Sequence, residues 1–201
     1  MKVYKFSPKN YFGANTYVAV SKDEAVAVDP SVSFSEVKEA LGEAKVRYIL
    51  LTHCHFDHIL KLDEWVEKTG AEVIIGLLDK SGLSDPITNC YKLVLGIDGG
   101  YYGKATAVTE SDLFSFGEMS VRIIATPGHT AGGVSYLMGD SLFAGDTVFA
   151  GGGYGRCDFP SGSEAELFGS ISRICRLPDG ITVYSGHGDD TTVSELKRYF
   201  K

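Results

Sequence analysis

Apolar stretches in the first part of the chain are separated by turn and capping signals. Two β-branched or aromatic runs flank Ser21-Lys22-Asp23, which predicts a hairpin. Ser33 and Glu36 have the spacing of a capping box, which predicts a helix that stops near Gly42. A continuous apolar run typical of a buried strand follows, and a helical pattern then closes at Gly70. The predicted order is strand, strand, helix, strand, helix, strand, over residues 15–20, 24–29, 33–42, 46–51, 59–68 and 71–75.

The second part of the chain repeats this plan loosely. A hairpin is expected across Gly139-Asp140, and a second capping box at Ser163 and Glu166 opens a helix that runs to about Arg176. Two halves that each contain a hairpin, a helix and a strand favour an α/β (α+β) fold with two mixed sheets face to face and helices outside, a four-layer αββα sandwich. Periodicity alone also fits another α/β arrangement. The predicted strands are 113–116, 121–125, 133–138, 141–144 and 181–184.

Residues 79–104 are rich in glycine and lack this patterning. Long connections without secondary structure are uncommon inside compact domains and are usually functional, so we interpret this segment as a lid or substrate loop. No linker divides the chain, and 201 residues suit one large domain. We therefore expect a single domain over residues 1–201.

Composition limits the classes of partner. The chain has 19 basic and 26 acidic residues and a net charge of −7, so general affinity for nucleic-acid phosphates is not expected. The N-terminus lacks the apolar core of a secretory signal, and no run approaches the roughly 20 apolar residues of a membrane helix. The four cysteines form no CxxC pair, which favours free thiols. We expect a soluble, cytoplasmic monomer or homodimer that binds neither nucleic acid nor membrane.

Candidate metal ligands follow the apolar run 46–51, in the segment Thr52 to His58 (THCHFDH). His53 and His55 lie two residues apart on an extended segment and project to the same side, so they can bind one ion together. Asp57 and His58 fall where the chain turns, and can face a second ion. Imidazole and carboxylate suit zinc, and also iron or manganese. So many polar side chains in six residues would pack poorly without a cation.

Three further ligand candidates follow later strands on glycine-flanked loops: His129, Asp146 and His187. Glycine lets the backbone turn sharply and keeps space open beside an ion. Taken alone, His129 and His187 are more often packed or surface residues, and Asp146 could be a turn residue. For Asp29, which precedes a proline, we favour the turn interpretation. The joint pattern, which uses all five histidines, favours a metal centre.

The motifs THCHFDH, TPGHT, AGDT and SGHG, in this order, resemble those of the metallo-β-lactamase superfamily. The resemblance covers essentially the whole chain. Segments similar to LSDP-x-x-N (residues 83–89) and GR-x-DFP (residues 155–160) are typical of its small glyoxalase II-like branch. The expected fold is accordingly the metallo-β-lactamase αββα sandwich.

The resemblance implies a ligand assignment. His53, His55 and His129 would bind one ion; Asp57, His58 and His187 would bind the other; and Asp146 would bridge both. Lactamases with two zinc ions commonly place a cysteine or another residue where Asp146 stands, which argues against antibiotic hydrolysis as the native activity. The expected cofactors are two divalent ions, with zinc favoured and iron or manganese as alternatives.

The function implied is hydrolysis of a thioester of the hydroxyacylglutathione type. Two ions about 3.5–4 Å apart lower the pKa of a bridging water, so that hydroxide can attack the carbonyl, and Asp57 is placed to orient it. Full-length glyoxalase II carries an added C-terminal domain that holds glutathione, whereas this chain ends at Lys201, shortly after His187. The substrate could therefore be a thioester of another thiol carrier, or a lactone or other ester.

Other interpretations of the same motifs remain. Persulfide dioxygenases share them but use one iron, and His53, His129 and Asp146 would match a two-histidine, one-carboxylate site. A nuclease of the RNA-processing branch is disfavoured by the charge and by the lack of an inserted binding domain. A non-catalytic binding module is disfavoured because no ligand position is lost.

Four residues are candidates for the substrate region: Arg156, Asp158, Tyr154 and Tyr101. The Arg156 guanidinium could bind a substrate carboxylate, or it could organise its loop through Asp158. The tyrosines could equally be ordinary surface aromatics. A small-molecule thioester is the expected substrate.

Overall fold

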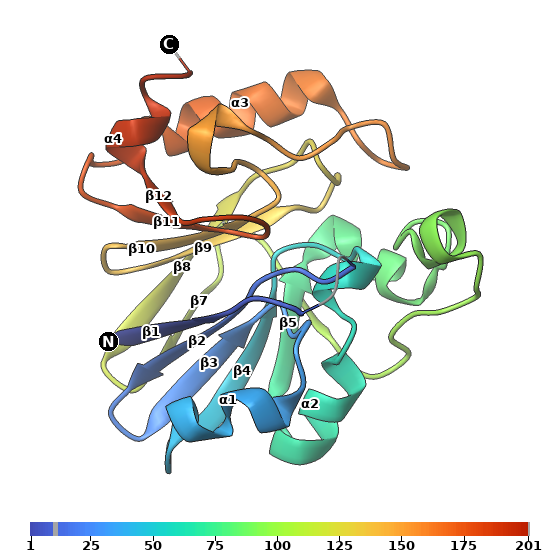
Figure 1. The fold of residues 1–201 in the computed structure, drawn as a ribbon, viewed down its shortest axis with the longest axis vertical. Coiled ribbons are helices and arrows are strands. Elements are labelled where there is room, and N and C mark those ends of the chain that lie inside the picture. Colours follow the sequence, from blue (N-terminus) through green and yellow to red (C-terminus); the bar gives the residue numbers. More distant parts are fainter. Residues whose placement is uncertain (10–11, 201) are drawn as a thin grey trace.

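Two six-stranded sheets face each other in the computed structural model, which describes residues 1–9 and 12–200 (Figure 1). In spatial order the first sheet contains β1 (Lys2–Phe6), β2 (Thr16–Ser21), β3 (Glu24–Val28), β4 (Lys45–Leu51), β5 (Glu72–Gly76) and β6 (Thr106–Val108). The second contains β12 (Thr191–Thr192), β11 (Thr182–Ser185), β10 (Ser141–Gly145), β9 (Val134–Met138), β8 (Met119–Ala125) and β7 (Leu113–Phe116).

Both sheets are mixed. In the first, β1, β2 and β3 pair antiparallel, and the pairs from β3 to β6 are parallel. In the second, the pairs from β7 to β10 are antiparallel, β10 and β11 are parallel, and β12 returns antiparallel. Three of the parallel connections, from β3 to β4, β4 to β5 and β10 to β11, contain an α-helix that packs against its sheet.

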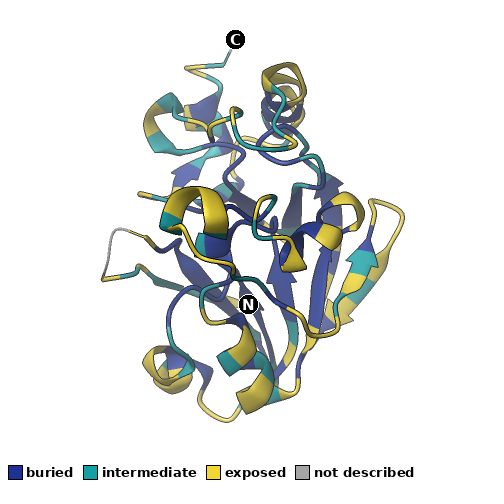
Figure 2. Cartoon of the chain, turned by 90° about the vertical axis from the view of Figure 1, so that its right-hand side faces the viewer, coloured by how far each residue is buried: buried dark blue, intermediate teal, exposed yellow. Residues whose placement is uncertain are grey.

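Helices form the two outer layers. Figure 1 shows α1 (Phe34–Leu41) and α2 (Leu62–Thr69) against the first sheet, and α3 (Glu164–Ile174) and α4 (Val193–Leu196) against the second. Apolar side chains pack between each sheet and its helices, for example Trp65 and Leu167, and between the sheets, for example Tyr136. Figure 2 shows buried strands inside and exposed helix faces outside. The predicted four-layer αββα sandwich is confirmed.

Local signals place the helix ends as predicted. The Glu36 carboxylate accepts a hydrogen bond from the Ser33 backbone N–H at 3.2 Å, and the Ser163 hydroxyl accepts from the Glu166 N–H at 3.4 Å. Gly70 ends α2 in the left-handed conformation. This helix begins at Leu62 rather than at residue 59, because Phe56–His58 first form a separate 3₁₀ turn.

Four elements were not predicted from the sequence: β1, β6, β12 and α4. β6, β12 and α4 are very short, and lysines interrupt the apolar pattern of β1 (KVYKF). Pairing with the neighbouring strand or packing on the sheet stabilises these elements, so the signal is tertiary rather than local.

The segment predicted as a lid, residues 79–104, contains short helical turns at Ser81–Ser84 and Tyr91–Leu95. Its first residue is structural: the buried Asp79 carboxylate accepts hydrogen bonds from the Cys54 N–H at 3.1 Å, the Thr130 hydroxyl at 2.7 Å and the Gly132 N–H at 2.7 Å. Asp79 thus ties together the loops that carry His55 and His129. Within the described residues, no helix is both long and apolar enough to cross a membrane.

Candidate metal centre

The end of β4 delivers the first group of polar side chains. This strand is buried at its end, and the chain continues as an extended segment through His53 and His55, whose ring centroids lie 4.7 Å apart. The 3₁₀ turn Phe56–His58 then places Asp57 and His58 beside them. The short spacing in the sequence therefore becomes a compact cluster because the backbone changes from extended to helical within it.

Three other loops complete the cluster. His129 follows β8, Asp146 follows β10, and His187 follows β11. The loop of His187 is held from the first sheet: the Asn15 side-chain amide donates to Ser185 O at 3.0 Å and Gly188 O at 3.1 Å. The structure thus brings together all seven residues predicted as metal ligands, from both sheets, around one point.

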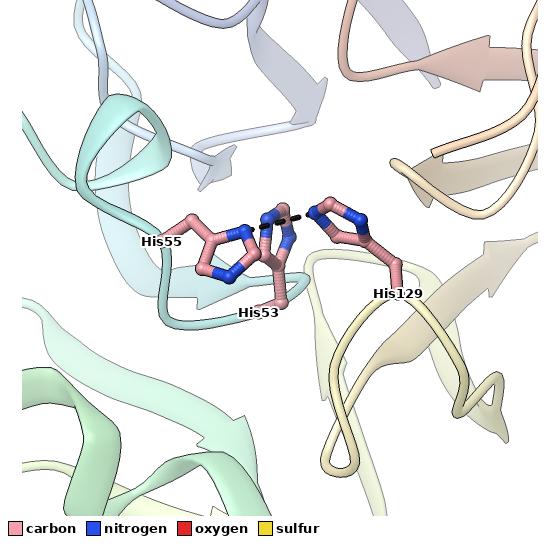
Figure 3. Close-up of side chains that lie close together, drawn as sticks. All are labelled: His53, His55 and His129. Atoms are coloured by element: carbon pink, nitrogen blue, oxygen red, sulfur yellow. Dashed lines mark hydrogen bonds between the residues drawn. The ribbon is translucent and has the colours of Figure 1, made fainter. Parts of the chain in front are cut away.

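Three buried histidines form the first set of ligand candidates. Figure 3 shows the rings of His53, His55 and His129 converging, with His55 Nδ1 2.9 Å from His129 Nε2. One ligand atom from each residue lies within 4.8 Å of the other two. Such a set of imidazole nitrogens can bind a single cation from one side.

A second set contains Asp57, His58 and His187, whose ligand atoms also lie within 4.8 Å of one another. Asp57 Oδ2 is 3.1 Å from His187 Nε2 and 3.8 Å from His58 Nε2. The side chain of His187 is 39% exposed, whereas His58 is fully buried. This half of the centre therefore faces the solvent.

The Asp146 carboxylate lies between the two sets. Its Oδ1 is 3.3 Å from His58 Nε2, and its Oδ2 is 3.4 Å from His187 Nε2 and 3.7 Å from His129 Nε2. A third group of potential ligand atoms joins Asp146 to His53 and His58, one histidine from each set. This position suits a carboxylate that bridges two ions.

Outer partners orient three of the imidazoles through Nδ1. His53 Nδ1 lies 3.1 Å from the Thr52 hydroxyl, and His129 Nδ1 donates to Arg156 O at 2.7 Å. His58 Nδ1 lies 2.8 Å from Asp29 Oδ2. With Nδ1 engaged, the Nε2 lone pair of each ring is directed at the centre, as is usual for metal-binding histidines.

Asp29 was missed as a functional residue. The turn interpretation is right for its backbone, which has φ +53°, but its buried carboxylate also accepts hydrogen bonds from the Thr52 N–H at 2.8 Å and from the Thr52 hydroxyl at 2.7 Å. Its position could have indicated this role, because Asp29 directly follows a buried strand, as Asp146 does.

Unpaired buried atoms point to a cation. Among the described residues, four buried side-chain atoms have no hydrogen-bond partner: His53 Nε2, His55 Nε2, His58 Nε2 and Asp146 Oδ1. Buried polar atoms are normally paired, and all four belong to candidate ligands of one cluster. Their nitrogen and oxygen chemistry fits zinc, iron or manganese. The donor set therefore fits metal ions.

The charge distribution also fits. Burial and the neighbouring imidazoles hold the pKa of His53 well below its usual value, and burial lowers the pKa of His55 to about 3. Both rings are therefore neutral, the state in which an imidazole can bind a metal ion. Around the second set, burial opposes the charge of His187, but hydrogen bonding to Asp146 outweighs it and raises the pKa of His187 to about 9. Carboxylates thus make that half attractive to cations.

The structure shows why one position beside the ligand candidates, Gly186, is a glycine. A side chain there would collide with Asp146 Oδ1 and would approach His58 Cε1. Only glycine lets the backbone pass this close to the centre. The expectation that glycine keeps space open beside the ligands is realised at this position.

The centre opens into a cleft of about 380 Å³. Of the four predicted substrate residues, only Arg156 lines it. Asp158 accepts two hydrogen bonds from Arg156, each 2.6 Å, and Tyr154 packs on Phe168 at 5.1 Å. The other residues lining the cleft are Phe12, His55, Phe56, Asp57, Cys90, Val94, His129, Asp146, Phe149, Gly155, Phe159 and His187.

Tyr101, predicted as a residue of the substrate region, does not line the cleft. It is 4% exposed and packs in the core with α2, with its hydroxyl donating to Lys104 O at 3.1 Å. Apolar side chains surround its ring, and an aromatic ring is more stable when buried among them than when exposed in a cleft. Tyr101 therefore does not reach the metal centre.

The family model of the metallo-beta-lactamase superfamily matches residues 10–187. The chain belongs to the metallo-beta-lactamase superfamily. The matched region includes all seven predicted metal ligands and ends at the last of them, His187. The predicted family is confirmed.

Two of three similar curated proteins carry hydrolase names, and the third is a glyoxylase. Probable metallo-hydrolase YqgX of Bacillus subtilis is 33% identical over 90% of this chain and 87% of the relative. Probable polyketide biosynthesis zinc-dependent hydrolase PksB of the same species is 32% identical, over 92% and 79% of the two chains. Glyoxylase B2 of Dictyostelium discoideum is 34% identical over 73% of this chain and 51% of that protein.

Solved superfamily structures have the same fold. BLEG-1, described as a B3 metallo-beta-lactamase, has a TM-score of 0.90 and 29% identity over 98% of this chain and 97% of its own. ETHE1 from Myxococcus xanthus has a TM-score of 0.78 and 27% identity, over 100% and 83%. TTHA1623 in a di-iron-bound form has a TM-score of 0.82 and 25% identity, over 99% and 98%. Glyoxylase B2 and ETHE1 fit the predicted glyoxalase II-like branch.

Proposed function

We propose that this metallo-beta-lactamase superfamily member is a binuclear metal-dependent hydrolase of small thioesters, of the hydroxyacylglutathione hydrolase type. The observation that supports it most directly is the position of Asp146. Its two carboxylate oxygens face histidines of both ligand sets, and Oδ1 is buried without a hydrogen-bond partner. A carboxylate placed in this way suits two ions a few ångströms apart better than one.

Each residue has a separate task in this proposal. His53, His55 and His129 hold one ion, Asp57, His58 and His187 hold the other, and Asp146 bridges them. When bound, two divalent ions supply a water of lowered pKa and polarise the substrate carbonyl. Asp57 is placed to orient the attacking water and to hold its proton, because its carboxylate lines the cleft. Zinc is the proposed metal, with iron or manganese as alternatives.

Glutathione is not required as the thiol carrier in this proposal. Of the Lys and Arg residues in the described part of the chain, only Arg156 lines the cleft, and it is already paired with Asp158. Glutathione has two carboxylates to neutralise, so contacts to it are partial. We expect modest selectivity for the tripeptide, about 10–200-fold in kcat/KM.

The test begins with elemental analysis of protein purified without added metal. The zinc-loaded protein is then assayed with S-lactoylglutathione, with a small thioester that lacks the tripeptide, and with a chromogenic β-lactam. Both thioesters should be hydrolysed faster than the β-lactam, and the Asp146→Ala variant should be inactive on all three. A preference for the glutathione ester far above a thousandfold would reveal a glutathione site and contradict the carrier proposal.

A second candidate is a persulfide dioxygenase-like oxidoreductase with one iron. The likeness to ETHE1 fits it, and His53, His129 and Asp146 offer two imidazoles and one carboxylate. Oxygen consumption with glutathione persulfide by the iron-loaded protein, together with no turnover of either thioester, would favour this function. Faster turnover of the β-lactam than of the thioesters would instead favour antibiotic hydrolysis, the activity named for BLEG-1.

A further inference from the structure

The walls of the cleft differ in character from its floor. The floor contains the ionisable residues of the metal centre, and the walls are apolar over most of their extent. The apolar lining residues are Phe12, Phe56, Val94, Phe149 and Phe159. None of them is a metal ligand, so the proposed hydrolysis does not by itself explain their presence.

Two phenyl rings flank the metal centre. The Phe159 ring centroid lies 5.7 Å from that of His55, in the first ligand set, and the Phe149 centroid lies 6.1 Å from that of His187, in the second. Both contacts are edge-on. A substrate carbonyl placed over Asp146 therefore has an aromatic ring near each end of the ligand cluster.

The apolar character continues at the mouth of the cleft. Val94 is 41% exposed and Phe12 is 55% exposed, and both line the cleft. Exposed apolar groups gathered around a concave site are typical of ligand-binding surfaces.

Among the described residues, Arg156 supplies the only guanidinium that lines the cleft, and it already has a partner. Arg156 donates from Nε and Nη2 to the two carboxylate oxygens of Asp158, each at 2.6 Å, and its Cζ lies 4.1 Å from the centroid of the Phe159 ring. The positive charge of Arg156 is therefore already compensated by Asp158, which weakens its attraction for a substrate carboxylate.

We propose that the cleft selects thioesters whose acyl group is apolar and uncharged, such as a medium-chain aliphatic or aromatic acyl group, held between Phe149 and Phe159. This inference rests on the proposed thioester hydrolysis for its substrate class. The selection itself comes from side chains outside the ligand sets. Each buried methylene contributes about fourfold in affinity or rate, from about 0.8 kcal/mol per methylene.

The activity test uses thioesters of N-acetylcysteamine, a neutral thiol, with acetyl, hexanoyl, benzoyl and succinyl groups. We expect hexanoyl and benzoyl thioesters to exceed acetyl by about 10–200-fold in kcat/KM, and succinyl to be the poorest. Phe149→Ala and Phe159→Ala should each reduce the hexanoyl-to-acetyl ratio. Phe168→Ala is the matched control, because this ring packs on Tyr154 outside the cleft lining and is 42% exposed.

The Arg156–Asp158 pair gives a separate charge test. Asp158→Asn removes the partner charge of Arg156 without changing the cleft lining. It should raise the succinyl-to-hexanoyl ratio by about tenfold, because the guanidinium becomes available to a carboxylate. An unchanged ratio would show that the pair does not screen anionic acyl groups.

A binding measurement separates this inference from the proposed function. Calorimetry on the zinc-loaded protein compares benzyl mercaptan with mercaptosuccinate, and needs no turnover. We expect benzyl mercaptan to bind at least tenfold more tightly, and Phe149→Ala and Phe159→Ala to remove most of that difference while Phe168→Ala retains it. Equal affinities, or tighter binding of mercaptosuccinate, would overturn the apolar-cleft proposal even if thioesters are hydrolysed. The expected binding preference without any thioesterase activity would contradict the proposed function alone.

Discussion

Asp29 Oδ2 and His58 Nδ1 lie 2.8 Å apart, and neither side chain is more than 2% exposed. The same carboxylate accepts two hydrogen bonds from Thr52, the residue before His53. Asp29 therefore contacts both ligand sets without being a ligand candidate itself, directly through His58 and through Thr52 beside His53. It fixes the proton on His58 Nδ1 and leaves Nε2 directed at Asp146.

Replacing Asp29 with Asn should weaken metal binding by about 10–100-fold, because the amide cannot orient and polarise His58 as a carboxylate does. Affinity is measured by competition with a chromogenic chelator, with zinc as the metal. Asp98→Asn is the matched control, since Asp98 is 70% exposed and pairs with Lys92 at the surface. Unchanged zinc affinity in Asp29→Asn would remove the orienting role.

Two metal ions should be found per chain when metal is supplied in excess, because the six residues besides Asp146 form two separate sets of three. The measurement is anomalous scattering from a metal-loaded crystal, supported by elemental analysis. His187→Ala should retain the ion of the buried histidine set and weaken or lose the other. One ion at full loading, with His58 and His187 turned elsewhere, would contradict the binuclear assignment.

Asp146→Ala should reduce metal-dependent hydrolysis by more than about 100-fold, since even the outer partners of ligands cost 10–100-fold when lost. The fold should persist, because the residue stands just after β10 rather than in the apolar core. Activity is measured on the zinc-loaded variant, and far-ultraviolet circular dichroism and the melting temperature of the metal-free protein report the fold. Retention of two ions with normal turnover would exclude a bridging role.

Stability should fall above about pH 10, where tyrosines of the unfolded chain ionise. The buried Tyr17 hydroxyl donates to Ser185 O at 2.7 Å and lies 3.1 Å from Asp190 Oδ1, and burial raises the pKa of Tyr17 far above its usual value. The unfolded state therefore loses a proton that the native state keeps, and the free energy of unfolding falls by up to about 1.4 kcal/mol per pH unit for this group.

The check is urea unfolding between pH 9 and 11, the range around the usual tyrosine pKa. Tyr17→Phe should be less stable at neutral pH, through its lost hydrogen bonds, but its stability should decline less steeply with rising pH. Tyr102→Phe, at a surface position that is 73% exposed, serves as the control and should retain the parent slope. Equal slopes in Tyr17→Phe and the parent protein would contradict the assignment.

The ligand residues could be predicted because their signal is local and chemically unusual. Three histidines and an aspartate stand between positions 53 and 58, directly after a buried strand. The separate signals of His129, Asp146 and His187 were weaker, and the order of the motifs that contain them carried the superfamily resemblance. Asp29 could not be separated from an ordinary turn residue, because its partners His58 and Thr52 are 29 and 23 positions away.

The sequence by itself determined the helix ends, the main strands and the chemistry of the metal centre, since capping boxes, apolar runs and clustered imidazoles act over a few residues. Tertiary structure decided which polar groups meet. It buried Tyr101 in the core with α2, brought Asp29 to His58, and placed Phe149 and Phe159 on either side of the ligand candidates. These outcomes depend on how the two sheets and their loops pack, and no local pattern of residues encodes the distance between segments that are far apart in the chain.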